Sequence, residues 1–184
     1  TDREFQGGDL PSGSLEKGSY DSCTFFGLDL SGSYLDGCHF LDCEFHDGNL
    51  SNANIGGAEW NGVRFTGCKM VGLRFESCGQ YITGLRFENC QLDFSSFTGI
   101  EIPGTLFKDC SLREVDFSEA GLSRARFTGC NLQRANFMQT NLEGADFTSA
   151  HNYSLDPEQN RLRKARFSWE GLPGLLGKYG ILIE

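Results

Sequence analysis

The sequence predicts an all-β solenoid of stacked coils around a single apolar core, followed by a short C-terminal helix. Three observations predict it. A large apolar residue recurs at every fifth position, a small residue stands two positions before most of these, and glycine often stands two positions after. A period of five matches neither the helix period of 3.6 nor the strand period of 2. Units of this kind bury their apolar side only by stacking on one another.

The large apolar residues form two runs in phase. The first extends from Phe5 to Phe75, and the second from Ile82 to Phe147. Between them the phase slips by two residues, near Gly79-Gln80. Because the phase is otherwise unbroken, we expect one continuous repeat domain over residues 1–150 and a separate segment over residues 151–184.

Each unit reads small–x–large–x–x, with Cys, Ala or Ser at the small position. This resembles the pentapeptide-repeat family, whose pattern is A(D/N)LXX; the best matches are ANFMQ (135–139), ADFTS (145–149), CNLQR (130–134) and ARFTG (125–129). The resemblance covers residues 3–150. It implies a right-handed quadrilateral β-helix with four pentapeptides in each coil.

A coil of twenty residues makes a test possible within the sequence. When the central residues are sorted into four faces, allowing for the slip, one face contains only phenylalanine: Phe5, Phe25, Phe45, Phe65, Phe87, Phe107, Phe127 and Phe147. Stacked rings add roughly 0.5–1.5 kcal/mol per pair beyond burial. We therefore expect like residues to lie above one another in columns, with glycines at the corners between faces.

All eight cysteines fall at or beside the inward small position: Cys23, Cys38, Cys43, Cys68, Cys78, Cys90, Cys110 and Cys130. Zinc binding is the alternative, but it would need a CxxC loop or converging histidines. Disulfides are disfavoured because stacked side chains run parallel to one another. We expect reduced, buried thiols that act as small apolar groups, and therefore a cytoplasmic protein.

Composition and motifs exclude several classes of function. A net charge of -9 disfavours direct nucleic-acid binding, and no apolar run is long enough for a membrane span. The three histidines, His39, His46 and His151, do not gather with a nucleophile or a base. The glycines do not form a phosphate-binding loop. We expect no enzyme activity, no catalytic residues, no metal and no cofactor.

The last segment, residues 151–184, has a different pattern. Ser168 is a candidate helix cap, apolar residues at helical spacing follow, and Gly180 is a candidate helix stop. We expect a short helix and then an apolar strand, which together cap the solenoid and form a homodimer contact. The expected contact residues are Leu172, Leu175, Leu176, Tyr179, Ile181, Leu182 and Ile183.

Residues 152–184 also resemble the ending of the gyrase-protecting branch of the family. This branch contains the Qnr quinolone-resistance proteins and the immunity proteins against gyrase-directed peptide toxins. The resemblance implies an acidic, rod-shaped homodimer that imitates duplex DNA and binds DNA gyrase or topoisomerase IV. The long loops that project from the coils of the Qnr proteins are missing here.

Charge gives a separate indication of DNA mimicry. Residues 18–63 contain seven acids and no lysine or arginine. They span roughly 11 Å at ~4.8 Å per coil, a length over which DNA carries roughly six or seven charges. The expected partner-binding residues are Asp21, Phe26, Leu41, Asp42, Glu44, Asp47 and Glu59. Two alternatives stay open: a solvated acidic surface without a role, and an interaction scaffold for an unrelated protein.

Overall fold

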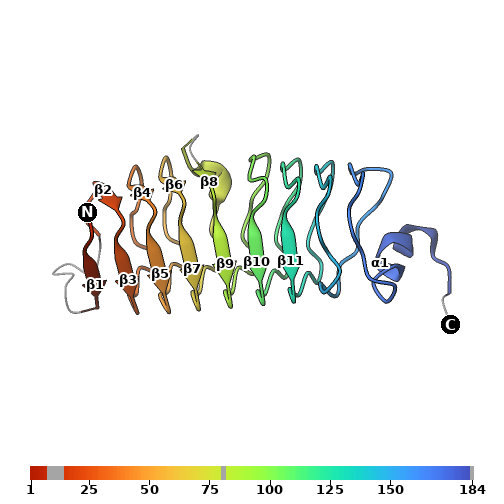
Figure 1. Cartoon of the computed structure of the whole chain (residues 1–184), viewed down its shortest axis with the longest axis horizontal. Coiled ribbons are helices and arrows are strands. Elements are labelled where there is room, and N and C mark those ends of the chain that lie inside the picture. Colours follow the sequence, from red (N-terminus) through yellow and green to blue (C-terminus); the bar gives the residue numbers. More distant parts are fainter. Residues whose placement is uncertain (8–14, 80–81, 183–184) are drawn as a thin grey trace.

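The computed structural model describes residues 1–7, 15–79 and 82–182. The chain winds into a straight row of coils and ends beside a short helix, with the two termini at opposite ends of the rod (Figure 1). Parallel strands and bridges join each coil to the next. The predicted all-β solenoid is confirmed.

Two faces of the rod are parallel sheets of very short strands. Face one contains β1 (Glu4–Gln6), β3 (Thr24–Phe26), β5 (Glu44–His46), β7 (Arg64–Thr66), β9 (Arg86–Glu88), β10 (Leu106–Lys108) and β11 (Arg126–Thr128). Face four contains β2 (Ser19–Asp21), β4 (His39–Leu41), β6 (Glu59–Asn61) and β8 (Ile82–Thr83). Faces two and three are held by single bridges, such as Asn49↔Lys69 and Ser96↔Asp116. The coil is therefore four-sided.

The register agrees with a coil of twenty residues. Phe25 pairs with Phe45, and across the slip Phe65 pairs with Phe87. The 3₁₀ turn η1 (Phe75–Ser77) precedes the slip, and the same columns resume at Ile82, which pairs with Trp60. A slip of two residues therefore lengthens one coil without changing which side chains face inward.

The core is a set of stacked columns. In the phenylalanine column of face one, Phe87, Phe107 and Phe127 stack with ring centroids 5.1 and 5.2 Å apart and are fully buried. The column continues beyond the sequence repeat, since Phe167 stacks on Phe147 at 5.2 Å. The bridge Asp146↔Arg166 extends the backbone ladder equally far. A domain boundary at residue 150 stays a prediction, and the ladder itself runs past it.

The cysteines line this core. Seven are buried, Cys78 is partly exposed, and all eight are free thiols. Five of the Sγ atoms donate to backbone carbonyls of the preceding coil, as in Cys110 Sγ to Phe87 O at 3.4 Å. Burial raises the pKa of Cys43 to about 11 and that of Cys78 to about 12. The expectation that the thiols serve as small core groups is consistent with this arrangement.

The corners use left-handed backbone, and some require glycine for a second reason. Gly67 has a φ of 66°. Asp47, with a φ of 53°, occupies the same corner one coil earlier. The carboxylate of Asp47 fills the space that a Cβ on Gly67 would occupy. The pair Asp42 and Gly62 repeats this arrangement at another corner. An aspartate on one coil thus rests on a glycine of the next.

The C-terminal helix is shorter than expected. Helix α1 (Pro173–Leu176) is followed by the 3₁₀ turn η2 (Gly177–Tyr179), and Gly180 ends it with a φ of 60°, as predicted. Ser168 does not cap the helix, because its Oγ accepts the N–H of Gly171 in a preceding turn. Pro173 then starts the helix, a position where its missing N–H costs nothing.

The expected apolar strand after the helix is wrong for its described part. Ile181 and Leu182 belong to no strand, and Ile183 lies outside the described residues. A strand needs a partner backbone, and this segment projects past the last coil (Figure 1). Among the described residues, no helix has the length and apolar character needed to cross a membrane.

Candidate partner-binding surface

Four of the seven predicted partner-binding residues lie where faces four and one meet: Asp21, Leu41, Asp42 and Glu44. Asp21 ends β2 and pairs in register with Leu41 of β4, while Phe26 ends β3. Asp42 occupies the corner that joins β4 to β5, with a φ of 49°. We call Asp21, Leu41, Asp42 and Glu44 the N-terminal acidic edge. The twenty-residue coil brings these side chains together from strands far apart in the sequence. Phe26 lies at the other end of face one, beside His46, and Glu59 begins β6 at the other end of face four.

Asp47 lies elsewhere. It follows His46 at the opposite end of β5, in the corner between faces one and two. The whole width of face one separates it from Asp42. Its carboxylate rests on Gly67, as Asp42 rests on Gly62. Sequence phase alone grouped Asp47 with the other acids, but the coil directs it to a different corner.

Two of the predicted partner-binding acids are paired. Glu44 lies 3.3 Å from Arg64 and 3.1 Å from His46, and Glu59 lies 2.6 Å from the Nδ1 atom of His39. Arg64 comes directly after the segment that lacks basic residues, so it escapes a count over residues 18–63. Asp21 and Asp42 form no ion pair among the described residues. The unpaired charge is therefore concentrated on these two aspartates.

The two apolar residues predicted to contact a partner point outward, as the repeat register predicts. Phe26 is 39% exposed and Leu41 is 42% exposed. The ring of Phe26 stacks on the imidazole of His46 with centroids 5.1 Å apart. One side of Phe26 is thus supported while its other side stays open to solvent. Such a supported aromatic is suited to contact with a partner.

The predicted homodimer residues differ in exposure. Leu172, Leu175 and Leu176 are half-buried, and Leu175 packs against the core. Tyr179, Ile181 and Leu182 are exposed. Lys178 anchors the turn through its Nζ, 2.7 Å from both Asp156 and Glu158, and holds the pKa of each carboxyl below its ordinary value. Trp169, which the pattern did not identify, is also exposed here.

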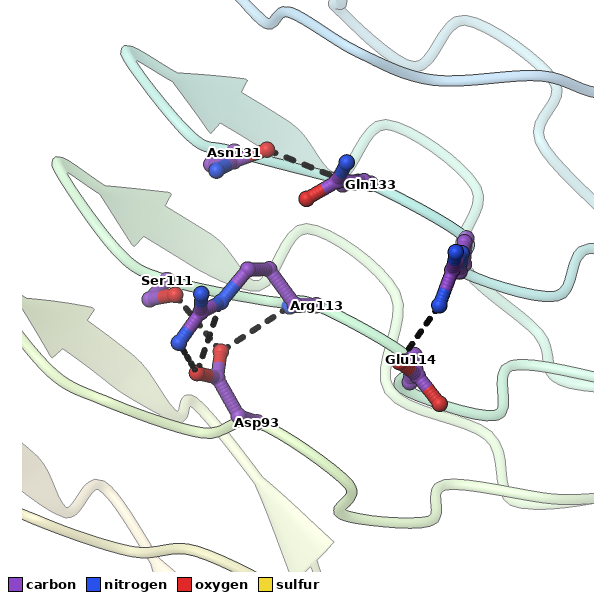
Figure 2. Close-up of polar contacts among 7 residues, drawn as sticks. Asp93, Ser111, Arg113, Glu114, Asn131 and Gln133 are labelled. Carbon is purple, nitrogen blue, oxygen red and sulfur yellow. Dashed lines mark hydrogen bonds and ion pairs between the residues drawn. The ribbon is translucent and has the colours of Figure 1, made fainter.

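Sequence reasoning missed the most strongly paired acid of the rod. Asp93 is buried and accepts four hydrogen bonds from the next coil, from Ser111 Oγ and from the N–H, Nε and guanidinium of Arg113 (Figure 2). Burial would raise the pKa of Asp93, but the hydrogen bonds from Arg113 and Ser111 hold it below its ordinary value. The signal that was available is the spacing, since Asp93 and Arg113 are one coil apart.

Phe94, next to Asp93, is an exposed aromatic in an unusual conformation. It is 59% exposed and has a φ of 62°, in a corner column where Gly72 precedes it and Glu114 follows it. The corner requires this backbone whichever residue stands there. Nothing in the structure explains why the residue is phenylalanine.

The described residues contain no group of three His, Cys, Asp or Glu side chains that could hold a metal ion. The surface hollows are open grooves between coils, lined by corner residues such as Arg124 and Lys164 or Asn52 and Gly72. A catalytic group would need an acid, base or nucleophile aimed at a common point in such a hollow.

Comparison with known proteins identifies the repeat. A model of pentapeptide repeats in eight copies matches residues 23–58 and 43–78, and a model of a pentapeptide repeat region matches residues 80–156. The chain belongs to the pentapeptide-repeat family. No curated protein sequence matches it.

Several solved structures of this family are similar to the chain. Trypsin-treated QnrB1, a plasmid-mediated fluoroquinolone resistance protein, is 17% identical, with both chains fully covered and a TM-score of 0.54. HetL, involved in heterocyst differentiation regulation in the cyanobacterium Nostoc sp. strain PCC 7120, is 15% identical over 83% of this chain and 75% of its own, with a TM-score of 0.44. At these identities the likeness concerns the fold.

Proposed function

We propose that the protein binds a bacterial type II topoisomerase, DNA gyrase or topoisomerase IV, as a DNA mimic and protects it from quinolones or peptide toxins. The N-terminal acidic edge is the proposed contact. The proposal draws on the C-terminal resemblance to the gyrase-protecting branch, and the fold shared with a fluoroquinolone resistance protein agrees with it.

The observation that carries the proposal is the pairing pattern of the edge. Asp21 and Asp42 are unpaired, lie about one coil apart and adjoin the exposed Leu41, while the exposed Phe26 lies across face one from them. One carboxylate per ~4.8 Å coil is comparable to one phosphate per ~3.4 Å along a DNA strand. Charge of this kind speeds association with a basic groove, and the apolar pair supplies the specificity that charge alone lacks.

The remaining parts of the proposal concern assembly and setting. Tyr179, Ile181 and Leu182 offer an exposed apolar group for a homodimer contact at the C-terminal end of the rod. The eight free thiols favour a reducing compartment such as the cytoplasm. We propose that the protein acts by binding alone, as a scaffold without enzymatic activity.

The test is a supercoiling assay with purified gyrase, carried out with and without a quinolone. We expect the protein to preserve activity in the presence of the drug. Asp21→Asn/Asp42→Asn should weaken gyrase binding mainly at low salt, and Phe26→Ala/Leu41→Ala should weaken it at every salt concentration. The matched control is Asp109→Asn/Glu119→Gln, which removes two acids at distant corners.

Each negative outcome has a defined meaning. Wild-type binding in the Asp21/Asp42 and Phe26/Leu41 variants, with the fold intact by circular dichroism, would move the contact to another surface. If wild-type protein neither binds gyrase or topoisomerase IV nor alters supercoiling, the topoisomerase proposal is wrong. In that case the repeat serves as a scaffold for an unrelated partner.

A further inference from the structure

The charge along the edge between faces four and one changes sign from one end of the rod to the other. The N-terminal coils present the unpaired acids Asp21 and Asp42. The C-terminal coils present six exposed cations on the same edge: Arg124, Arg126, Arg161, Arg163, Lys164 and Arg166. Of these six, only Arg166 forms an ion pair with a described residue, lying 3.2 Å from Asp146.

The cations are placed by the same register that places the acids. Arg161 belongs to the face-four ladder through its bridge to Asn141, and Arg166 belongs to the face-one ladder. Arg124 and Lys164 occupy the corner between these faces, with φ values of 59° and 61°, two coils apart. Gly144 stands between them, so an open groove of about 480 Å³ runs along the corner, with Arg163 and one acid, Glu143, also in its lining.

The middle of the edge carries one exposed cation without an ion pair among the described residues, Arg86 at the start of β9. The corner there is formed by glycines, Gly62, Gly84 and Gly104, which carry no side chain to hold another surface away. At the other end of face one, Lys108 is paired with Glu88 at 3.4 Å. A second rod could therefore approach closely over these coils.

We propose that a second copy of this chain docks antiparallel along this edge, with the acidic end of each rod against the basic end of the other. The arrangement is twofold symmetric, so one surface contacts its own copy and this contact by itself joins two chains. Asp42 and Lys164 are six coils apart, roughly 29 Å at ~4.8 Å per coil. That exceeds the screening length of about 8 Å at physiological salt, so the two ends of one rod do not neutralise each other.

The net charge of -9 does not oppose this contact, because screening makes the local charge decisive. A phosphate backbone is the other polyanion that the basic groove could bind. The second copy is favoured because its complementary surface lies on the same edge, at the distance that the antiparallel arrangement requires. A duplex laid along the edge would instead meet Asp21 and Asp42. The inference does not depend on the proposed topoisomerase partner, and its test uses the purified chain alone.

The test is a charge swap followed by light scattering. One variant reverses the basic end, Arg161→Glu/Arg163→Glu/Lys164→Glu, and the other reverses the acidic end, Asp21→Lys/Asp42→Lys. For the wild type we expect twice the mass at about 0.1 M NaCl as at about 1 M, where the screening length falls from ~10 to ~3 Å. Each variant alone should keep one mass at both salts. An equimolar mixture should recover the doubling, because every contact between the two variants is attractive.

The control is Lys69→Glu, which changes one charge on face two and should associate like the wild type. Recovery in the mixture also shows that both variants are folded. The proposal is overturned by wild-type masses that are equal at the two salts, or by a mixture that behaves like its components. Mass that grows without limit with concentration would indicate end-to-end contacts instead. Salt-sensitive binding of a short DNA duplex by a wild type of unchanged mass would assign the basic groove to nucleic acid.

Discussion

Truncating one ring of the phenylalanine column tests the core directly. Phe127 is fully buried, stacks on Phe107 at 5.2 Å and on Phe147 at 4.7 Å, and meets Phe117 edge-on at 5.8 Å. Phe→Ala in a packed core costs roughly 3–5 kcal/mol, and here the loss of two stacked pairs favours the upper end of that range. The matched control is Thr128→Ala, which changes the exposed neighbour on the same strand, β11.

Because each coil contacts only its neighbours, the damage should spread unevenly along the rod. Trp60 is buried several coils away and reports on the N-terminal half, whereas the other tryptophan, Trp169, is exposed. In denaturant, Phe127→Ala should lose circular dichroism signal well before the fluorescence of Trp60 changes, while Thr128→Ala keeps the two transitions together. An equal loss of unfolding free energy in Phe127→Ala and Thr128→Ala would refute the assignment of Phe127 to the inward face of the coil. If circular dichroism and Trp60 fluorescence change together in Phe127→Ala, the idea that each coil is stabilised mainly by its neighbours is refuted.

Three further outcomes are expected. The cysteines should react with a thiol reagent only after denaturation, because burial raises the pKa of Cys43 to about 11 and blocks access; rapid labelling of native protein would contradict this. Ile181→Asp/Leu182→Asp should halve the mass in high salt if the C-terminus forms the homodimer, and an unchanged mass would place the contact elsewhere. Asp93→Asn should cost roughly 1–3 kcal/mol at neutral pH. Since the folded pKa of Asp93 is depressed, its contribution is present above the unfolded value and is lost as pH falls through the lower folded value, so the difference between variant and wild type should shrink in acid in a urea titration.

The repeat could be predicted because it is specified at every fifth residue. Columns such as Phe87, Phe107 and Phe127 follow once the coil length is known, and the slip near Gly79 does not disturb them. The start of the C-terminal helix was harder to predict, because it occurs once and no repeat specifies it again. Ser168 was the predicted helix cap, but the structure starts the helix at Pro173 and the serine closes an earlier turn.

The pairing of surface charges could have been predicted from the same coil length of twenty residues. Ion pairs join residues twenty positions apart, such as Glu44 with Arg64, Glu88 with Lys108 and Glu114 with Arg134. A count of acids within a continuous segment misses these pairs, because the partner of each residue lies one coil away. The spacing does not reveal how well a pair is buried, and in this respect the Asp93–Arg113 pair stands apart.

The same spacing explains which acids keep their charge free for a partner. Glu44 stands one coil before an arginine and is paired. Asp42 stands one coil before Gly62, and that glycine both makes room for the carboxylate and supplies no cation to it. A corner aspartate over a glycine is therefore held in place and left unpaired, without the desolvation cost of a buried charge. In a stacked rod, the residue one coil ahead of an acid decides whether that acid stabilises the fold or remains available for binding.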